Sequence, residues 1–347
     1  MNPLPPGGMP RISVVVVNWN RRELLRQCLD SLLNQTVGDV HICVVDNGST
    51  DGSVELIELS YPGVRLVRNH DNRGFCAANN QGIFTSDCDL VALLNNDARA
   101  HPDWLRQLAA AFEGRPEVGM AASKILVAER PQVIDKVGHL IWPDGQNRGR
   151  GTGETDHGQY DQIEEVAWPD GCAAMYRRSM LDQIGGFDED LFAYADDAEL
   201  GLRARIAGWR CLYMPAAVVY HQRGATLGVA SARRLVLIER NRVLLAVKLF
   251  PLSLLWLNPV YYGLRVLAGA WAAWRGEGET KHYAGWSGKL TMVTALLEGD
   301  RQALAMAPRM WAKRKEIARF RKLSPDQVRQ LLRQYRIPLR TLSSQAS

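Results

Sequence analysis

The chain has 347 residues and a formal net charge of +5; 46% of its residues are hydrophobic and 23% are charged. This is an ordinary globular balance, which allows a sizeable core in one large domain or two moderate ones. The charge is unevenly distributed, because residues 301–340 contain twelve basic residues against only Glu316 and Asp326. We therefore expect an anionic partner for this tail and not for the protein as a whole.

The six cysteines and the apolar segments indicate in which compartment the protein is found and whether it spans a membrane. No two cysteines form a CxxC pair or stand at zinc-ligand spacing, so we predict reduced core thiols in a cytosolic protein. Residues 1–10 are rich in proline and glycine and lack the apolar stretch of a signal peptide, which predicts a flexible N-terminus. The most apolar region, residues 243–274, is interrupted by charged residues and prolines. It predicts an interfacial or buried helical pair and not a membrane span.

Strand and helix patterns alternate over the first part of the chain. Short β-branched or apolar runs predict strands, and apolar residues at helical spacing predict helices. The predicted strands are residues 12–17, 40–45, 64–67 and 90–94, and the helices between them are residues 22–33, 51–59 and 74–84. Such an alternation predicts βαβ units and an α/β protein with a parallel sheet.

The pattern changes further along the chain. It predicts helices at residues 102–112, 178–184 and 198–208, strands at residues 118–127 and 211–220, and a mobile polar loop at residues 145–159. After about residue 227 only helical patterns remain. We therefore expect a flexible segment over residues 1–10, an α/β domain over residues 11–226 and a helical region over residues 227–347.

Polar residues follow the predicted strands, at the edge where ligands bind in parallel sheets. Asn18 and Asn20 follow the first strand, and Asp46 follows the second. A carboxylate in this place can accept hydrogen bonds from a base N–H or from ribose hydroxyls. The alternative for Asp46 is a structural Asx-turn or a helix N-cap.

The fourth strand ends in Asn95, Asn96 and Asp97. If the strand geometry continues, Asn95 and Asp97 face the same side, where their oxygens suit a hard divalent cation such as Mg²⁺ or Mn²⁺. His221, at the end of the last predicted strand, offers a further ligand. The alternatives are a simple turn for the first group and a structural role for the histidine.

Three acids, Asp196, Asp197 and Glu199, begin a predicted helix. Acids are favoured at helix N-termini by the macrodipole, which is the structural explanation. The functional explanation is a general base beside a sugar-binding cleft, since crowded acids raise one another's pKa.

Together, the order and spacing of these segments resemble family 2 glycosyltransferases of the GT-A fold, across residues 11–224. The matching stretches are residues 14–20 (VVVVNWN), 44–53 (VVDNGSTDGS), 69–80 (NHDNRGFCAANN), 94–97 (LNND), 185–189 (GGFDE) and 192–203 (FAYADDAELGLR). The subgroup is similar to bacterial rhamnosyltransferases and galactofuranosyltransferases that build cell-surface glycans. The resemblance implies a mostly parallel central sheet flanked by helices, and the C-terminal extension predicted to be helical lies outside the resemblance.

The resemblance also implies roles for individual residues. Asp46 would hold the nucleobase, in a nucleotide pocket shaped by Asn18, Asn20, Gly74, Asn79, Asn95 and Asn96. Residues 95–97 stand where the family has its DxD metal motif, but the first acid is replaced by Asn95, so only Asp97 offers a charged ligand. His221 would complete the metal site. Asp197 would be the general base, with Asp196 and Glu199 beside it.

These roles imply an inverting transfer of a sugar from a nucleoside-diphosphate donor to a hydroxyl of a glycan or lipid-linked acceptor. The similarity to the subgroup implies a rhamnose-like sugar in cell-surface polysaccharide synthesis. The competing hypothesis is a catalytically inactive carbohydrate- or nucleotide-binding module on the same fold. A dehydrogenase is disfavoured because Asn18-Trp19-Asn20 stands where a GxGxxG loop would be needed. Nucleic-acid binding is disfavoured because the basic tail lacks an accompanying motif.

The C-terminal region offers two interpretations. Aromatic residues near basic ones suit the surface of an anionic membrane, which would place the enzyme in the cytoplasm, peripherally on the inner face of the plasma membrane. The aromatic residues concerned are Trp256, Tyr261, Tyr262, Trp271 and Trp274. The alternative is a helical lid packed on the α/β domain.

Overall fold

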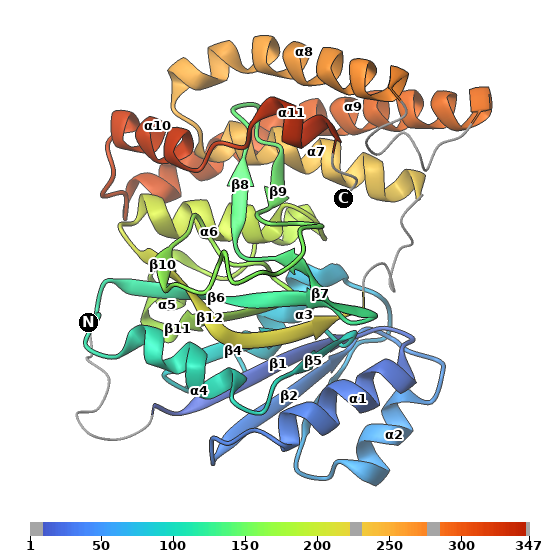
Figure 1. Ribbon diagram of the computed structural model, residues 1–347, viewed down its shortest axis with the longest axis vertical. Coiled ribbons are helices and arrows are strands. Elements are labelled where there is room, and N and C mark those ends of the chain that lie inside the picture. Colours follow the sequence, from blue (N-terminus) through green and yellow to red (C-terminus); the bar gives the residue numbers. More distant parts are fainter. Residues whose placement is uncertain (1–9, 223–230, 276–284, 345–347) are drawn as a thin grey trace.

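The computed structural model describes residues 10–222, 231–275 and 285–344. Nearly all of the predicted flexible N-terminus and the predicted boundary at residue 226 lie outside these residues. A ten-stranded sheet crosses the described structure (Figure 1), in the order β10-β12-β6-β11-β4-β1-β2-β3, with β5 paired to β12 and β7 paired to β6. The strands of this sheet are β1 (Ile12–Asn18), β2 (Val40–Asp46), β3 (Arg65–Arg68), β4 (Leu90–Leu94), β5 (Ala98–Ala100), β6 (Val118–Val127), β7 (Arg130–Lys136), β10 (Glu164–Glu165), β11 (Ala173–Arg177) and β12 (Arg210–His221).

The first four strands form the parallel part of the sheet. β1 pairs in parallel with both β2 and β4, and β3 continues the order beside β2. β11 runs antiparallel between β4 and β6, whereas β12 is parallel to β6. The register of β1 and β2 sets Asn18 opposite Asp46. The mostly parallel sheet predicted from the sequence is therefore confirmed, and its strand exits gather polar residues at one edge.

Helices cover both faces of this sheet. One face is covered by α1 (Arg22–Leu33), α2 (Ser53–Ser60) and α4 (Trp104–Ala109), which share an apolar core with the strands. The other face is covered by α3 (Gly74–Ile83), α5 (Arg178–Ile184) and α6 (Asp196–Ile206), which share a second core. β1 and β4 contribute to both cores, and burial on two sides explains why their sequences are continuous apolar runs.

The largest departures from the predicted elements fall between β6 and β11. The sequence patterns missed β7 and the small hairpin of β8 (His139–Ile141) and β9 (Asn147–Gly149). The predicted polar loop at residues 145–159 thus contains a paired strand. Its glycines are explained by backbone conformation, because Gly145, Gly151 and Gly153 all have positive φ angles. The predicted helix at residues 102–112 is also divided, into α4 and a 3₁₀ turn at Ala110–Phe112.

The C-terminal part is helical, as predicted. It consists of α7 (Ala232–Leu249), α8 (Leu252–Trp274), α9 (Gly285–Ala318), α10 (Pro325–Gln334) and α11 (Leu339–Ser344). α7 packs between α6 and α9, α11 packs on α8, and α8 lies at the edge of the molecule farthest from the N-terminal helices (Figure 1). Within the described ranges, none of the helices combines the length and apolar character needed to cross a bilayer.

Candidate active site

The exits of β1, β2 and β4 meet in a buried polar cluster. The Asn18 amide donates to the Asp46 carboxylate at 3.1 Å, and the Asn96 amide donates to the Asn18 side-chain oxygen at 2.8 Å. The second Asp46 oxygen accepts from the backbone N–H groups of Gly48 and Ser49. Asp46 therefore also forms the Asx-type turn that was the structural alternative, and it fixes the loop after β2.

Three other predicted nucleotide-site residues shape the same edge. Asn20 has a φ of 52°, and its side-chain oxygen accepts from the backbone N–H of Thr50. Gly74 has a φ of 85°, and a Cβ there would overlap the ring of Phe192 at 2.5 Å, so glycine is required on both counts. Asn79 is buried and donates to the Phe75 carbonyl one helical turn earlier. These side chains act on the shape of the site through the backbone.

Residues 95–97 form a turn, so the expectation that Asn95 and Asp97 alternate as in a strand is wrong. The Asn95 carbonyl accepts from the Ala98 N–H at 3.1 Å, and β5 begins at Ala98. The pairing of β5 with β12 then sets His221 opposite Ala98. As a result, Asp97 Oδ1 lies 3.4 Å from His221 Nε2.

His221 is oriented from its other nitrogen. Its Nδ1 lies 2.7 Å from Asp135 Oδ2, and Asp135 is buried. Burial lowers the pKa of His221, but Cys172, Asp135 and Asp97 outweigh it and raise the pKa well above its ordinary value. A carboxylate on one ring nitrogen, which leaves the other turned toward a second carboxylate, is the usual arrangement around a metal-binding histidine.

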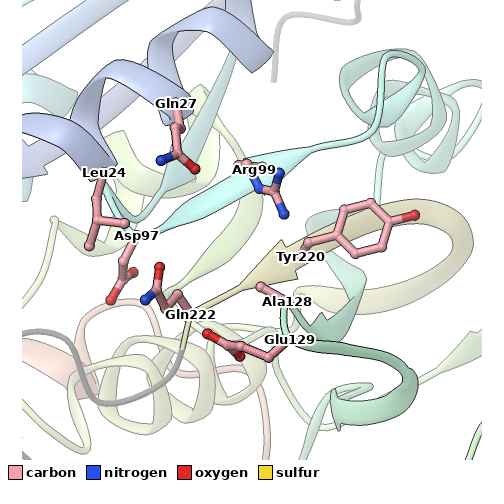
Figure 2. A pocket seen from close by; sticks show the side chains of 8 residues that line it. All are labelled: Leu24, Gln27, Asp97, Arg99, Ala128, Glu129, Tyr220 and Gln222. Atoms are coloured by element: carbon pink, nitrogen blue, oxygen red, sulfur yellow. The ribbon is translucent and has the colours of Figure 1, made fainter.

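Asp97 and His221 fit a divalent cation. Asp97 Oδ1 is buried and has no hydrogen-bond partner in the described structure. A buried carboxylate oxygen without a partner is costly, and an oxygen–imidazole donor set is compatible with Mn²⁺ or Mg²⁺. A cavity of about 290 Å³ opens beside Asp97, lined also by Arg99, Glu129 and Gln222 (Figure 2).

The three acids of α6 separate into different environments. Asp197 is the partly exposed one, and its Oδ2 lies 3.1 Å from His139 Nε2. Asp196 is buried, and burial together with the charge of Asp197 raises the pKa of Asp196 to about 8. The Glu199 carboxylate is fully buried and turned into an internal ion-pair network. Grouping all three acids as one catalytic cluster is therefore not supported for Glu199.

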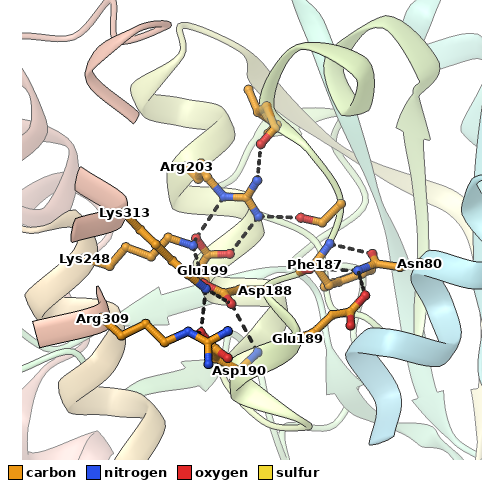
Figure 3. Close-up of polar contacts among 12 residues, drawn as sticks. Asn80, Phe187, Asp188, Glu189, Asp190, Glu199, Arg203, Lys248, Arg309 and Lys313 are labelled. Atoms are coloured by element: carbon orange, nitrogen blue, oxygen red, sulfur yellow. Dashed lines mark hydrogen bonds and ion pairs between the residues drawn. The ribbon is translucent and has the colours of Figure 1, made fainter. Parts of the chain in front are cut away.

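That network joins α6 to the C-terminal helices (Figure 3). Glu199 pairs with Arg203 at 2.8 Å and with Lys248 at 2.6 Å, and Lys248 also pairs with Asp188 at 2.6 Å. Lys313 of α9 contacts Asp188 as well. Burial would raise the pKa of Asp188, but the two lysines lower it to about 2. Part of the basic tail thus neutralises acids of the same chain.

His139, Asp170 and Lys136 adjoin Asp197, and the sequence patterns did not single them out. His139 Nε2 lies 2.9 Å from Asp170 Oδ2, which also accepts from Lys136 Nζ. Burial lowers the pKa of His139, but Asp197 and Asp170 outweigh it and raise the pKa to about 9. His139, Asp170 and Asp197 are close enough for a cation, yet Lys136 and a protonated His139 already balance the two acids.

These groups connect Asp197 to the Asp97 side of the site. Lys136 is adjacent in sequence to Asp135, which contacts His221. The partner of Lys136 is Asp170, and Cys172, two residues after Asp170, also interacts with His221. A sequence signal did exist: charged residues interrupt the otherwise apolar residues 133–141. A charge inside an apolar run is informative because buried charges are rare unless they are paired.

The loop before α6 holds Asp197 through unusual backbone angles. Phe192, Tyr194 and Ala195 have φ values of 64°, 70° and 54°, a conformation that is uncommon outside glycine. Asn241 of α7 is buried, and its amide donates to the carbonyls of Leu191, Ala193 and Tyr194 at 2.8–2.9 Å. The C-terminal helices thereby fix the loop that presents the acid.

Comparisons with known proteins fit this geometry. The model of glycosyl transferase family 2 matches residues 13–185. An N-acetylglucosaminyl-diphospho-decaprenol L-rhamnosyltransferase from Mycobacterium tuberculosis is 30% identical over 242 residues, which cover 62% of this chain and 78% of that protein. The chain belongs to family 2 of the glycosyltransferases. It is accordingly a transferase, as the sequence segments predicted.

Solved structures place this family 2 glycosyltransferase in the GT-A fold. GalNAc-T7, solved with UDP, GalNAc and Mn²⁺, aligns with a TM-score of 0.57 at 17% identity, over 69% of this chain and 48% of its own. The mannosyltransferase PcManGT from Pyrobaculum calidifontis, in complex with GDP-Man and Mn²⁺, aligns with a TM-score of 0.52 at 19% identity. This alignment covers 96% of this chain and 86% of that chain. At these identities the likeness concerns the fold alone.

Proposed function

We propose that this glycosyltransferase moves a sugar, with inversion, from a nucleoside diphosphate to an acceptor hydroxyl, using Mn²⁺ or Mg²⁺ held by Asp97 and His221. The observation that carries the proposal is the buried Asp97 oxygen, which lacks a hydrogen-bond partner beside a histidine oriented by Asp135. Both metal-bearing structural neighbours were solved with Mn²⁺ and a nucleotide or nucleotide sugar. Bound there, the cation supplies positive charge that stabilises the departing diphosphate.

Asp197 is the proposed general base. Among the three acids of α6 it alone is partly exposed, so a substrate can reach it. Asp197 takes the proton of the acceptor hydroxyl while that oxygen forms a bond to the anomeric carbon. The bond from this carbon to the diphosphate oxygen breaks, and the nucleoside diphosphate leaves with the electron pair. One displacement of this kind inverts the anomeric centre.

His139, Asp170 and Lys136 are proposed as positioning residues. A positively charged His139, fixed on Asp170, lies 3.1 Å from the Asp197 carboxylate and would hold that carboxylate in one orientation. Asp196, with its pKa of about 8, carries a proton at neutral pH and adds no second negative charge. Glu199 is assigned to support of α6 and not to the chemistry.

The polar cluster at the strand exits is the proposed nucleotide pocket. Asp46 and Asn18 fix the loop at residues 47–49, against which the nucleobase and ribose would lie. Asn20, Gly74 and Asn79 hold the surrounding backbone, and Asn95 and Asn96 complete the turn that leads to Asp97. In this proposal Asp46 both fixes the loop after β2 and binds the nucleobase.

The mycobacterial relative suggests the acceptor class, because its name specifies a sugar-diphosphate carrier with a decaprenol tail. We propose a lipid-linked or glycan acceptor and a rhamnose-like donor, within cell-surface polysaccharide synthesis. Such an acceptor would bring the enzyme to the inner face of the membrane as a peripheral protein.

An assay of nucleoside-diphosphate release tests the proposal. The purified protein is incubated with a panel of sugar nucleotides and a lipid-diphosphate sugar acceptor, with Mn²⁺ or with EDTA. Release that needs one donor, the acceptor and the cation is expected. Nucleotide-sugar binding without release under any of these conditions would favour the inactive binding module instead.

A further inference from the structure

α8 lies at the edge of the molecule (Figure 1), and it exposes a stripe of apolar side chains. The exposed side chains recur every three or four residues, so they share one face of the helix. They are Trp256, Val260, Leu264, Leu267, Trp271 and Trp274. Trp256 is 84% exposed and Trp274 is 77% exposed, values that are unusual for the largest apolar side chain. Contiguous exposed apolar surface of this kind marks an interaction site.

The opposite face of α8 is fixed to the protein, so the direction of the stripe is set by the fold. Arg265, the one charged residue in the sequence of α8, pairs with Asp144 at 2.6 Å and with Glu239 at 2.9 Å. Tyr261 packs edge-to-face on Trp142. The helix therefore presents an uncharged outer face, unlike an ordinary solvent-facing helix, where charged residues dominate.

Basic residues flank this stripe. α11, which packs on α8, carries the exposed Arg340. Arg275 is exposed directly after the last turn of α8. Between residues 319 and 340 the chain has seven basic residues and one acid, Asp326. Tryptophan in an apolar stripe with arginines beside it matches the chemistry of an anionic membrane surface.

We propose that the outer face of α8 docks on an anionic lipid bilayer, with Trp256, Trp271 and Trp274 at the level between headgroups and acyl chains. The flanking arginines meet the lipid phosphates. Since the helix is too polar to span, it lies in the plane of the interface. This inference concerns lipid alone and holds whatever donor or acceptor the enzyme uses.

Vesicle flotation of the full chain provides the test, with phosphatidylcholine containing 30% phosphatidylglycerol as the probe. The parent protein is expected to float with these vesicles and to bind pure phosphatidylcholine more weakly. Trp256→Ser/Trp271→Ser/Trp274→Ser is expected to lower the partition coefficient at least about ten-fold, since each substitution removes a large exposed apolar area that the bilayer would bury. Arg275→Gln/Arg340→Gln should weaken binding several-fold, and only to the anionic vesicles.

Matched controls separate docking from folding. Leu59→Ser/Ile163→Ser removes two exposed apolar side chains outside α8 and should leave flotation unchanged. Equal melting temperatures of the parent and the triple tryptophan variant would establish that the variant is folded. If it is not folded, the single variant Trp256→Ser is tested for flotation in its place. Failure of the parent to bind anionic vesicles, or undiminished binding by the tryptophan variants, overturns the proposal. A third outcome would also overturn it: light scattering shows a dimer for the parent and a monomer for the tryptophan variant, and neither protein binds lipid. The stripe would then be an interface between copies of the chain.

Discussion

Two buried charge clusters lie on either side of α6, and they use their charges differently. Around Glu199, each acid is met by a lysine or arginine of the same chain, and the pKa values of Glu199 and Asp188 are lowered. Around Asp197, Lys136 and His139 balance the charges of Asp170 and Asp197, but Asp197 itself stays partly exposed. Asp196 holds a pKa of about 8, and at the strand exits Asp97 keeps an oxygen without a hydrogen bond.

The difference separates support from chemistry. A fully paired cluster is closed to ligands, and breaking it removes stability. A partly exposed acid beside a neighbour with a raised pKa, and a carboxylate oxygen without a hydrogen bond at the nearby strand exits, have interactions left for a substrate or cation, which is typical of functional sites. Substitutions in the two clusters should therefore have opposite effects on activity and on stability.

The largest expected effect is on turnover in Asp197→Asn. Loss of a general base typically costs about 10²–10⁴-fold in rate, so transfer should be nearly abolished. Donor binding should persist, because Asp197 faces the acceptor side in our proposal. Steady-state kinetics and calorimetry with the donor measure the two quantities. Turnover within a few-fold of the parent would remove Asp197 from the role of base.

Glu199→Gln should show the reverse pattern. Removing one partner of a buried ion pair costs about 3–5 kcal/mol in the free energy of unfolding, whereas activity per folded molecule should change only a few-fold. Denaturant unfolding and kinetics on the same sample measure both. The control is Glu298→Gln, whose pair with Arg301 is exposed to solvent and should leave the free energy of unfolding nearly unchanged. A stable but inactive Glu199→Gln would contradict the division between the clusters.

The two clusters should affect the free energy of unfolding at opposite ends of the pH range, the Asp197 cluster at alkaline pH and the Glu199 cluster at acid pH. The folded-state pKa of His139 is raised to about 9, so its contribution is complete below pH 6.5 and is lost as the pH rises through 9. The folded-state pKa of Asp188 is lowered to about 2, so its contribution is present above pH 4 and is lost as the pH falls toward 2. These shifts correspond to losses of about 3 kcal/mol for His139 and about 2 kcal/mol for Asp188.

Variants assign the two limbs. The free energy of unfolding is measured for each protein from pH 2 to 10. In His139→Gln its decrease at alkaline pH should disappear, and in Asp188→Asn its decrease at acid pH should disappear. If both variants retained the parental profile, these ion pairs would not account for it.

A smaller effect is expected from Asp135→Asn. Loss of the carboxylate that orients a metal-binding histidine usually weakens the metal about 10–100-fold. Titration with Mn²⁺ measures this affinity. The control is Asp161→Asn, which removes an acid paired with Lys124 at the surface and should leave the affinity unchanged. Equal affinities in the parent and Asp135→Asn would separate Asp135 from the metal site.

The parallel sheet and its polar edge were predictable because local patterns carry them. β1, β2 and β4 are short apolar runs, and the residues after them converge by the geometry of a parallel sheet. The surroundings of Asp197 were not predictable in this way. His139 and Asp170 come from a hairpin and a turn whose contacts are set by tertiary packing. Glu199 looked like a third site acid because sequence spacing does not tell which helix face meets Lys248.

The central claim is that Asp97 holds a cation which binds the nucleoside diphosphate. Calorimetry of nucleoside-diphosphate binding, with Mn²⁺ and with EDTA, tests it most directly in the parent, Asp97→Ala and Glu199→Gln. The account predicts Mn²⁺-dependent binding in the parent and in folded Glu199→Gln, and loss of that dependence in Asp97→Ala. Unchanged Mn²⁺-dependent binding in Asp97→Ala would contradict it.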